Sequence, residues 1–308
     1  MARVLCDRWT PYEQARAALA LVDVALETAA APWSGDDVVG LISWEPVTVA
    51  DLGRLPALRV ISTPSVGFEH IDVEAATQRG IWVCHVPDYC VDEVADHALA
   101  LLLALVRGIV ELDRSVGEGD WDAKAAGPLR RLGDVRLGVV GFGRIGRALA
   151  ARALGLGLDV QATDPVVPDE TIGAAGVRPA TLDELLRTSD AVSLHTPLTG
   201  DTDGLIGARE LALLPRGAYL VNVARGSLVD ETAMLAALES GQLAGAALDT
   251  LGVEPPTQAP RAPRLIVTPH AAWYSQEAEA AAHRRAAESV RAALEGSRPL
   301  DAVNEVVQ

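Results

Sequence analysis

The segment RLGVVGFGRIGRALAARALGLGLDVQATD, residues 136–164, decides the fold of this 308-residue chain. It begins with an apolar run that favours a β-strand and continues through Gly141, Gly143 and Gly146 into a helical pattern. A second apolar run follows and ends in Asp164. The order of strand, glycine-rich turn, helix and strand is typical of a βαβ unit that binds phosphates at the start of its helix.

The spacing of these residues has a physical explanation. Gly141 permits the tight turn, Gly143 lets a pyrophosphate approach the backbone, and Gly146 lets helix and strand pack closely. Asp164 lies 18 residues beyond Gly146, where a carboxylate accepts hydrogen bonds from an adenosine ribose and repels a 2′-phosphate. The segment therefore predicts NAD rather than NADP as cofactor. The alternative is an ordinary glycine-rich turn followed by a capping aspartate.

Apolar runs alternate with helical patterns on both sides of this segment. The other strand-like runs are residues 3–7, 38–43, 57–63, 81–86, 191–197, 217–224, 243–249 and 264–270. Because parallel strands need crossover helices, the alternation predicts an α/β fold with two doubly wound parallel sheets. We expect a Rossmann NAD-binding domain, residues 97–274, inserted in a flavodoxin-like substrate domain, residues 1–96 and 275–308. Ligands of such sheets lie in a crevice at the carboxyl ends of the strands.

Two further segments are predicted to be helical. Residues 91–116 read as one long helix that is apolar on too many faces for a surface position, so we expect it to pack between domains or subunits. Trp121 is interpreted as packing on this helix. Residues 275–295 form the second predicted helix, and the final residues to Gln308 are expected to be a short extended tail.

Composition excludes several classes of function. The chain has 42 acidic and 26 basic residues and a net charge of −16, which disfavours nucleic acid as a partner. The longest apolar run, Ala98 to Val106, is too short to cross a membrane, and the N-terminus reads as a strand rather than a signal peptide. Cys6, Cys84 and Cys90 lack a metal-binding spacing and are interpreted as reduced core thiols, so we expect no metal and a cytoplasmic location.

Three ionisable residues follow predicted strands at positions that favour catalysis. Arg225 stands at a strand exit where a guanidinium can grip a carboxylate through two hydrogen bonds, and Glu254 precedes two prolines in a loop. His270 ends the run LIVTPH, where an imidazole in a crevice is a proton donor. Singly, each has a structural alternative: a salt bridge, a loop acid or a core histidine. Their order after the glycine motif favours the catalytic interpretation.

The chain resembles the D-isomer-specific 2-hydroxyacid dehydrogenases over nearly its full length. The matching motifs are SVGFEHID (65–72), VPDYCVDEVADHALALLLAL (86–105), VVGFGRIGR (139–147), SLHTPLT (193–199), LPRGAYLVNVARGSLVD (214–230), GAALDTLGVEP (245–255) and TPHAAW (268–273). Residues 87–98 and 270–275 look most like the branch that includes the C-terminal binding proteins, which are corepressors with a dehydrogenase fold. His85 and His97 are interpreted as structural.

The resemblance implies a role for each of the three ionisable residues. Arg225 binds the substrate carboxylate and carbonyl, His270 exchanges a proton with the substrate oxygen, and Glu254 orients His270. A carboxylate beside an imidazole also stabilises its protonated form. These roles suit 2-oxo acid reduction, in which negative charge develops on the carbonyl oxygen. The implied activity is NAD-dependent interconversion of a 2-oxo acid and a D-2-hydroxy acid, in a homodimer.

The resemblance also implies the rest of the binding residues. Asp249 resembles the position that holds the nicotinamide carboxamide, and the loop at 195–197 resembles one beside the adenosine. The full set implied for the cofactor is Gly141, Gly143, Arg144, Ile145, Gly146, Asp164, His195, Thr196, Pro197, Thr202, Val223, Ala224, Arg225, Asp249, His270 and Ala272. The set implied for the substrate is Val66, Gly67, Arg225 and Trp273.

The substrate loop departs from the usual pattern of the family. Thr63 and Ser65 precede Val66 where relatives have a basic or polar residue, and Glu69 adds negative charge. Backbone N–H groups of such a loop still bind a carboxylate, but a second anionic group on the substrate is disfavoured. Phe68 is a candidate pocket residue or a core residue. Two alternative functions stay open: an NAD(H)-sensing interaction protein of the corepressor kind, and formate- or phosphite-type oxidation on the same fold.

Overall fold

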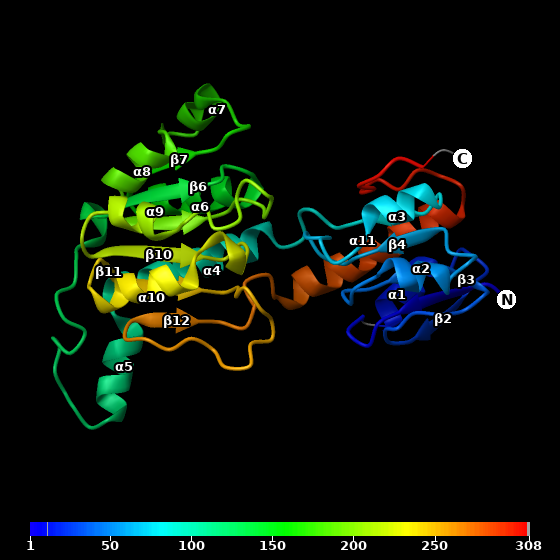
Figure 1. Cartoon of the computed structure of the whole chain (residues 1–308), viewed down its shortest axis with the longest axis horizontal. Coiled ribbons are helices and arrows are strands. Elements are labelled where there is room, and N and C mark those ends of the chain that lie inside the picture. The colour runs from blue at the N-terminus through cyan, green and yellow to red at the C-terminus, as the bar shows by residue number, and fades with distance from the viewer. Residues whose placement is uncertain (11, 307–308) are drawn as a thin grey trace. The chain divides into compact units, whose positions relative to one another are not determined.

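The computed structural model describes residues 1–10 and 12–306, which form two compact α/β units (Figure 1). Unit 1 comprises Met1–Cys90 and Tyr274–Gln308, and unit 2 comprises Val91–Trp273. Each unit contains one parallel sheet, so the predicted fold class is confirmed. The predicted boundary between the two domains, at residues 96 and 97, lies inside a helix that begins at Val91. The two units divide at the start of that helix, between Cys90 and Val91.

The sheet of unit 1 has five strands in the order β2-β1-β3-β4-β5, the flavodoxin-like order. The strands are β1 (Arg3–Cys6), β2 (Ala25–Thr28), β3 (Val38–Ile42), β4 (Val60–Ser62) and β5 (Trp82–Cys84). The helices are α1 (Tyr12–Leu19), α2 (Val49–Gly53), α3 (Val73–Gln78) and α11 (Gln276–Leu294). Strand β2 was missing from the predicted runs because this edge strand, ALET, is short and half polar.

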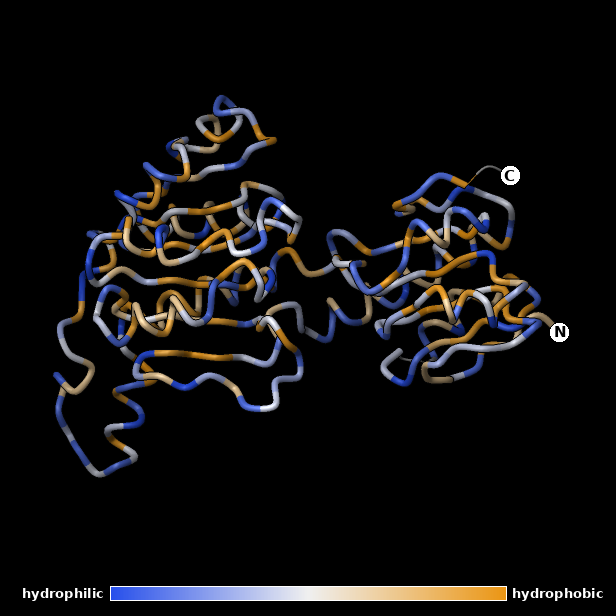
Figure 2. Tube along the Cα trace, in the orientation of Figure 1, coloured by the Kyte–Doolittle hydropathy of each residue, from blue (hydrophilic) through white to orange (hydrophobic). Residues whose placement is uncertain are grey.

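Alternate residues of the unit 1 strands enter opposite cores. Val4 packs in a cluster with Ala286 and Val290 of α11, whereas its neighbour Leu5 packs in a second cluster with Leu52 of α2. Side chains of a strand point alternately to the two faces of its sheet, so helices must cover both faces. The apolar strands are visible as orange stretches of the chain in Figure 2.

The sheet of unit 2 has seven strands in the order β12-β11-β10-β9-β6-β7-β8. Counted from β6, this is the Rossmann order with one additional strand, and the direction of winding reverses between β6 and β9. The strands are β6 (Arg136–Val140), β7 (Asp159–Thr163), β8 (Arg178–Pro179), β9 (Ala191–Leu194), β10 (Ala218–Asn222), β11 (Leu243–Leu248) and β12 (Leu265–Val267). The two-residue strand β8 was not predicted.

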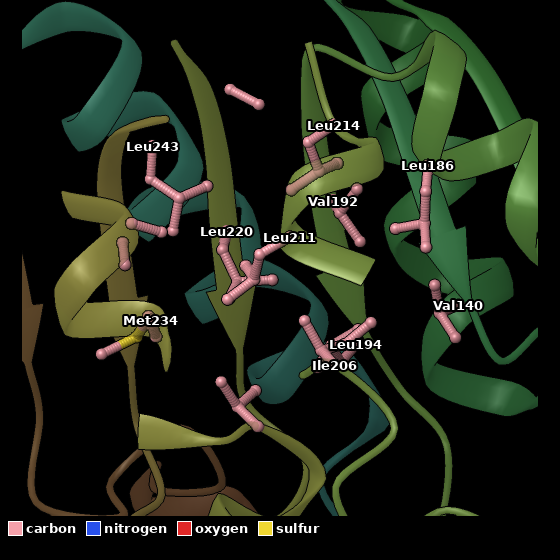
Figure 3. Close-up of a cluster of buried hydrophobic side chains, with 14 of the residues drawn as sticks. Val140, Leu186, Val192, Leu194, Ile206, Leu211, Leu214, Leu220, Met234 and Leu243 are labelled. Atoms are coloured by element: carbon pink, nitrogen blue, oxygen red, sulfur yellow. The ribbon is translucent and has the colours of Figure 1, made fainter. Parts of the chain in front are cut away.

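Helices cover both faces of the unit 2 sheet. The helices of this unit are α4 (Val91–Arg107), α5 (Ile109–Gly117), α6 (Arg144–Gly155), α7 (Asp169–Ala174), α8 (Leu182–Thr188), α9 (Ala208–Leu213) and α10 (Glu231–Glu239), with 3-10 turns η1 (Leu132–Asp134) and η2 (Gly226–Leu228). Of these, α5 has no buried residue and does not cover the sheet. Figure 3 shows the core in which Leu194 and Leu220 of the sheet meet Leu211 of α9 and Met234 of α10. Helix α4 packs against β10, β11 and α6.

The long helix predicted over residues 91–116 is two helices. Gly108 separates α4 from α5 with φ +58°, a left-handed conformation that glycine adopts at little cost and that breaks the helical path. A Cβ at this position would lie 2.5 Å from the Cβ of Ala126, so the close approach also requires glycine. The expectation that Trp121 packs on the helix is wrong, because Trp121 is 89% exposed in the single chain.

The C-terminal predictions agree with the structure where it describes them. Helix α11 follows Ser275, whose side chain accepts a hydrogen bond from Ala278 N. The chain then returns along β5, where Val303 N donates to Val83 O. The last two residues of the predicted tail, 307–308, lie outside the described residues.

None of the described helices has the length and apolar character that a membrane span requires.

His283 of α11 is a titratable group in the core of unit 1. Its ring is fully buried, stacks on Trp44 with centroids 5.6 Å apart, and has no hydrogen-bond partner at either nitrogen among the described residues. Burial lowers the pKa of His283 to about 4, although the nearby carboxylate of Asp7 acts to raise it. The folded chain therefore holds this imidazole neutral where an unfolded chain would protonate it.

This burial predicts an acid-sensitive stability. Protonation stabilises the unfolded state as pH falls below about 6.5, and the loss ends near the folded pKa of about 4, so His283 removes roughly 3 kcal/mol of unfolding free energy across that window. His283→Phe keeps an aromatic ring on Trp44 and removes the titration. We expect its unfolding free energy, from urea titrations, to fall less steeply with acid than that of the unchanged chain. Equal slopes would contradict the assignment.

Candidate functional site

The glycine-rich turn lies between β6 and α6, beside the point where the sheet reverses its winding. Gly141 has φ +93°, and a Cβ there would lie 2.7 Å from the carbonyl carbon of His195 after β9. A Cβ on Gly146 would lie 2.0 Å from the Gly141 carbonyl oxygen. Gly143 meets nothing within 4 Å, and no side chain caps α6 there. The turn thus leaves an open approach to the N-terminus of a helix, which is the arrangement that phosphates bind.

Asp164 lies after β7 and is tied to the glycine turn. Its Oδ2 accepts a hydrogen bond of 2.7 Å from Phe142 N, and its Oδ1 accepts from Val166 N and Val167 N. Burial acts to raise the pKa of this carboxyl, but the three backbone donors outweigh it and hold the pKa below its usual range. An ionised carboxylate has four acceptor positions, so Asp164 keeps acceptor capacity for a ribose hydroxyl.

The loop after β9 carries four of the predicted cofactor residues: His195, Thr196, Pro197 and Thr202. His195 Nε2 lies 2.8 Å from Ser193 Oγ. Burial lowers the pKa of His195 to about 3, so its ring is neutral at physiological pH. Thr202 Oγ1 donates to Pro197 O at 2.7 Å and thereby closes the loop. The four predicted cofactor residues of this loop are therefore all neutral at physiological pH.

Glu254 and His270 are in direct contact. His270 Nδ1 lies 2.6 Å from Glu254 Oε2, and Glu254 Oε1 accepts a hydrogen bond of 2.7 Å from Leu251 N. Because an ionised carboxylate only accepts, His270 Nδ1 carries the proton in this contact. In the neutral ring the second nitrogen, Nε2, is then the one without a proton. The side chain of His270 is 45% exposed, so its ring is open to solvent in the single chain.

A strained turn presents His270. Its φ of +52° lies in the left-handed region, which disfavours a side chain by roughly 1–2 kcal/mol. Asp249, after β11, offsets this strain with three acceptors for consecutive N–H groups. Its backbone oxygen accepts from His270 N, its Oδ1 from Ala271 N, and its Oδ2 from Ala272 N, at 2.8, 2.9 and 3.0 Å. The turn at the end of β12 is therefore shaped by the end of β11.

Arg225 occupies the exit of β10, the next strand of the same sheet edge. The buried Asn222 donates to Arg225 O at 2.7 Å and accepts from Ala224 N at 3.0 Å, which fixes the path of the chain. A Cβ on Gly226 would lie 1.9 Å from the carbonyl carbon of Leu251, so the Arg225 turn packs directly on the chain that leads to Glu254. The three predicted catalytic residues thus lie on packed turns of unit 2.

Two residues that shape these turns, Asn222 and Thr268, were not predicted as site residues. Thr268 Oγ1 lies 2.5 Å from Asp249 Oδ1. Each is a polar residue at the end of an apolar strand, and that position was the available signal. Among the other predicted residues, Arg144 and Ile145 begin α6, and Val223 and Ala224 lead from β10 to Arg225.

The predicted substrate loop lies in unit 1 after β4. His85 Nδ1 lies 2.8 Å from Val66 O, and Ser65 Oγ donates to Gly67 O at 2.6 Å. Thr63 is fully buried, and its hydroxyl lies 2.6 Å from that of Ser65. These contacts fix the loop. The residues from Thr63 to Gly67 include no positively charged side chain. Trp273, the fourth predicted substrate residue, is the last residue of unit 2 and is half-buried.

Comparison with known proteins places the chain in a family. Residues 99–272 match the family described as D-isomer specific 2-hydroxyacid dehydrogenase, NAD binding domain. The glyoxylate reductase of Korarchaeum cryptofilum is 39% identical over 279 residues, which are 88% of this chain and 83% of that protein. The D-lactate dehydrogenase of Aquifex aeolicus, solved with NAD and lactic acid, has a TM-score of 0.83 and 29% identity over 95% of this chain and 96% of that chain.

A third relative is longer than this chain. The D-3-phosphoglycerate dehydrogenase of Mycobacterium leprae is 40% identical over 255 residues, which are 82% of this chain and 48% of that protein. The chain spans about half the length of that relative.

The fold and the glycine turn define a dinucleotide-binding oxidoreductase. The chain belongs to the D-isomer-specific 2-hydroxyacid dehydrogenases, and it is an NAD-dependent enzyme that interconverts 2-oxo and 2-hydroxy acids. The open space at Gly143 and the uncapped start of α6 fit the pyrophosphate of NAD. When bound, NAD supplies the hydride chemistry that the side chains lack.

Proposed function

We propose that Arg225, Glu254 and His270 are the catalytic residues of this dehydrogenase. The observation that carries the proposal is the 2.6 Å contact between Glu254 and His270 on a turn that holds His270 in a left-handed conformation. Strain of this kind persists only where surrounding contacts enforce it, and it is common at active sites. Arg225 lies on the adjoining turn of the same sheet edge.

Each residue has a distinct task in reduction of a 2-oxo acid. Arg225 binds the carboxylate and stabilises the negative charge that develops on the carbonyl oxygen. His270 Nε2 gives that oxygen a proton, and Glu254 stabilises the imidazolium form and fixes the ring through Nδ1. In the reverse direction His270 accepts the proton of the 2-hydroxy acid. We also propose that the glycine turn, Asp164 and the loop from His195 to Thr202 bind NAD.

The preferred substrate is proposed to be a 2-oxo acid with one carboxylate and an uncharged, partly apolar side chain. The loop from Thr63 to Gly67 offers no cation, and Glu69 follows it. Backbone N–H groups of Val66 and Gly67 suit one carboxylate. A second carboxylate or phosphate meets repulsion there, whereas an alkyl group gains about 25 cal/mol per Å² buried against aromatic surface such as Trp273.

A second candidate is an NAD(H)-sensing interaction protein of the corepressor kind, which the likeness of residues 87–98 and 270–275 to that branch supports. The intact Arg225, Glu254 and His270 favour the enzyme. A sensing role depends on NAD binding and does not require catalysis. Turnover of a 2-oxo acid at ordinary enzymatic rates would therefore distinguish the enzyme from the sensing protein. Formate- or phosphite-type oxidation would instead require a much smaller donor.

We further propose a homodimer that uses α5 and the chain after it. Helix α5 has no buried residue in the single chain, and Ile109, Val116 and Trp121 are 55, 51 and 89% exposed. The helix projects away from the sheet of unit 2 (Figure 1). Apolar side chains gathered at such a segment favour a second copy as partner. A cytoplasmic location is supported by the burial of Cys6, Cys84 and Cys90 in the apolar cores, because buried thiols suit a reducing compartment.

The reaction and its substrate class are tested with a panel of 2-oxo acids and NADH. We expect 2-oxoisocaproate to give a higher kcat/KM than oxaloacetate or 3-phosphohydroxypyruvate, measured from the loss of NADH absorbance. The highest value for either dianionic compound would contradict the proposed substrate class. Absence of turnover with every 2-oxo acid would contradict the enzyme itself.

The proton donor is tested with two variants. Glu254→Gln should lower kcat, because it removes the carboxylate that fixes the His270 ring through Nδ1. His270→Gln should lower kcat by roughly 10²- to 10⁴-fold. Near-normal turnover of that variant would refute the assignment.

Cofactor preference is tested at Asp164. The unchanged enzyme should prefer NADH, and Asp164→Ala should reduce the ratio of kcat/KM for NADH over NADPH by roughly tenfold, as expected for loss of one charge-assisted hydrogen bond of about 1.5 kcal/mol. Asp159→Ala, at the opposite end of β7, is the control and should leave the ratio unchanged. Equal kcat/KM values for the two cofactors in the unchanged enzyme would overturn the role of Asp164.

The dimer is tested by light scattering at micromolar concentration. We expect a mass near twice 32.3 kDa. Trp121→Glu should raise the dimer dissociation constant by roughly 30-fold or more, because interface tryptophans often contribute about 2 kcal/mol. Leu300→Glu changes another side chain that is 85% exposed and should leave the mass unchanged. A monomer at micromolar concentration would exclude the proposed interface.

A further inference from the structure

His97 on α4 is linked to the turn that presents His270. His97 Nε2 lies 3.1 Å from Thr268 Oγ1, and Thr268 Oγ1 lies 2.5 Å from Asp249 Oδ1. His97 Nε2 is also 3.6 Å from Asp249 Oδ1, so its ring stands beside both groups. The side chain of Asp249 is fully buried, and that of His97 is 26% exposed. A chain of polar contacts therefore runs from helix α4 to the end of β12.

The direction of these hydrogen bonds follows from the donors available. Asp249 Oδ1 already accepts from Ala271 N, and a carboxylate only accepts, so the single hydroxyl proton of Thr268 points to Asp249. Thr268 Oγ1 is then an acceptor toward His97. His97 must accordingly carry its proton on Nε2. The network thus selects one tautomer of His97, which an apolar environment would not do.

Asp249 is the point through which this network reaches His270. Its three acceptors fix the N–H groups of residues 270, 271 and 272, and those bonds hold the left-handed turn. The Thr268 hydroxyl is one of the donors that fix the orientation of the Asp249 carboxylate. A change in that orientation would weaken the Ala271 and Ala272 bonds and with them the turn that places His270 beside Glu254.

We propose that His97 is a positioning residue of the dehydrogenase: its Nε2–H acts through Thr268 and Asp249 to hold His270 in its catalytic conformation. This inference rests on the proposed role of His270. It replaces the interpretation of His97 as structural only, and it assigns no contact between His97 and the substrate.

Activity measurements test the network through matched variants. His97→Leu removes the donor, and we expect kcat for 2-oxo acid reduction to fall roughly 10- to 100-fold, as misplaced catalytic groups do. Thr268→Val should have the same effect, and the double variant should add little, because each change breaks the same chain. His97→Gln offers an amide donor and should restore kcat to within about threefold of normal.

The control is Asp96→Asn, which removes an exposed ion pair between α4 and Arg152 and should leave kcat unchanged. Equal losses in the leucine and glutamine variants, or additive losses in the double variant, would show that His97 acts only by filling space and would overturn the proposal. Normal kcat in a folded His97→Leu enzyme would do the same.

A measurement on the unchanged enzyme avoids dependence on variants that fold poorly. NMR of protein labelled with 15N-histidine, recorded above the titration range of histidine, should show His97 as the Nε2–H tautomer. The Nδ1–H tautomer would overturn the network. This readout needs no turnover, so it separates failure of the network from failure of the proposed reaction: an inactive enzyme with the expected tautomer would refute the reaction and leave the hydrogen-bond chain intact.

Discussion

The buried carboxylate of Asp249 is the interaction on which the proposed active site depends. It lies at the end of β11, between the strand that leads to Arg225 and the strand that ends in His270. Asp249 N donates to Asn222 O, and Asp249 O accepts from His270 N. Neighbouring strand ends are therefore joined by hydrogen bonds rather than by loop packing alone. A buried carboxylate is stable only when its oxygens accept hydrogen bonds. The backbone N–H groups that satisfy Asp249 belong to the turn after β12, so the same hydrogen bonds also fix the shape of that turn.

The glycine-rich turn is constrained instead by the lack of room for side chains at two of its glycines. Side chains are excluded at Gly141 and Gly146 because β6, α6 and the loop after β9 approach one another too closely. Gly143 meets open space instead, at the start of a helix whose dipole attracts negative charge. The strands reverse their winding at this position, which leaves the carboxyl edge of the sheet uncovered. Close packing and an open approach thus occur within six residues of one turn.

The histidines of this chain differ in their surroundings. Helices cover both faces of each sheet, and a histidine is either enclosed by this packing or left exposed at a strand end. His195 and His283 are enclosed, and burial lowers the pKa of each well below its usual value. His270 is partly exposed at a strand end, and its ring is held by an acidic partner. Burial therefore separates these two neutral rings from the one that faces solvent.

The sequence by itself determined the class of fold, the cofactor turn and the identity of the candidate catalytic residues. Those features are local: apolar runs of fixed period, glycines at fixed offsets, and polar residues directly after strands. It did not reveal the break at Gly108, because one residue in left-handed conformation outweighs the helical preference around it. It also missed β2 and β8, whose few residues form strands only when a neighbour supplies hydrogen bonds.

Tertiary structure alone decided how the strand ends are connected. Asn222, Thr268 and His97 lie in three of the motifs that match the family, but many positions separate them and the sequence assigns none of them a hydrogen-bond partner. Their hydrogen-bond contacts depend on sheet order, which places the ends of β10, β11 and β12 side by side. They also depend on α4, which packs on β10 and β11. Hydrogen bonds between distant segments depend on three-dimensional distance and on which donors remain after the backbone is satisfied. Neither quantity can be read from a linear pattern.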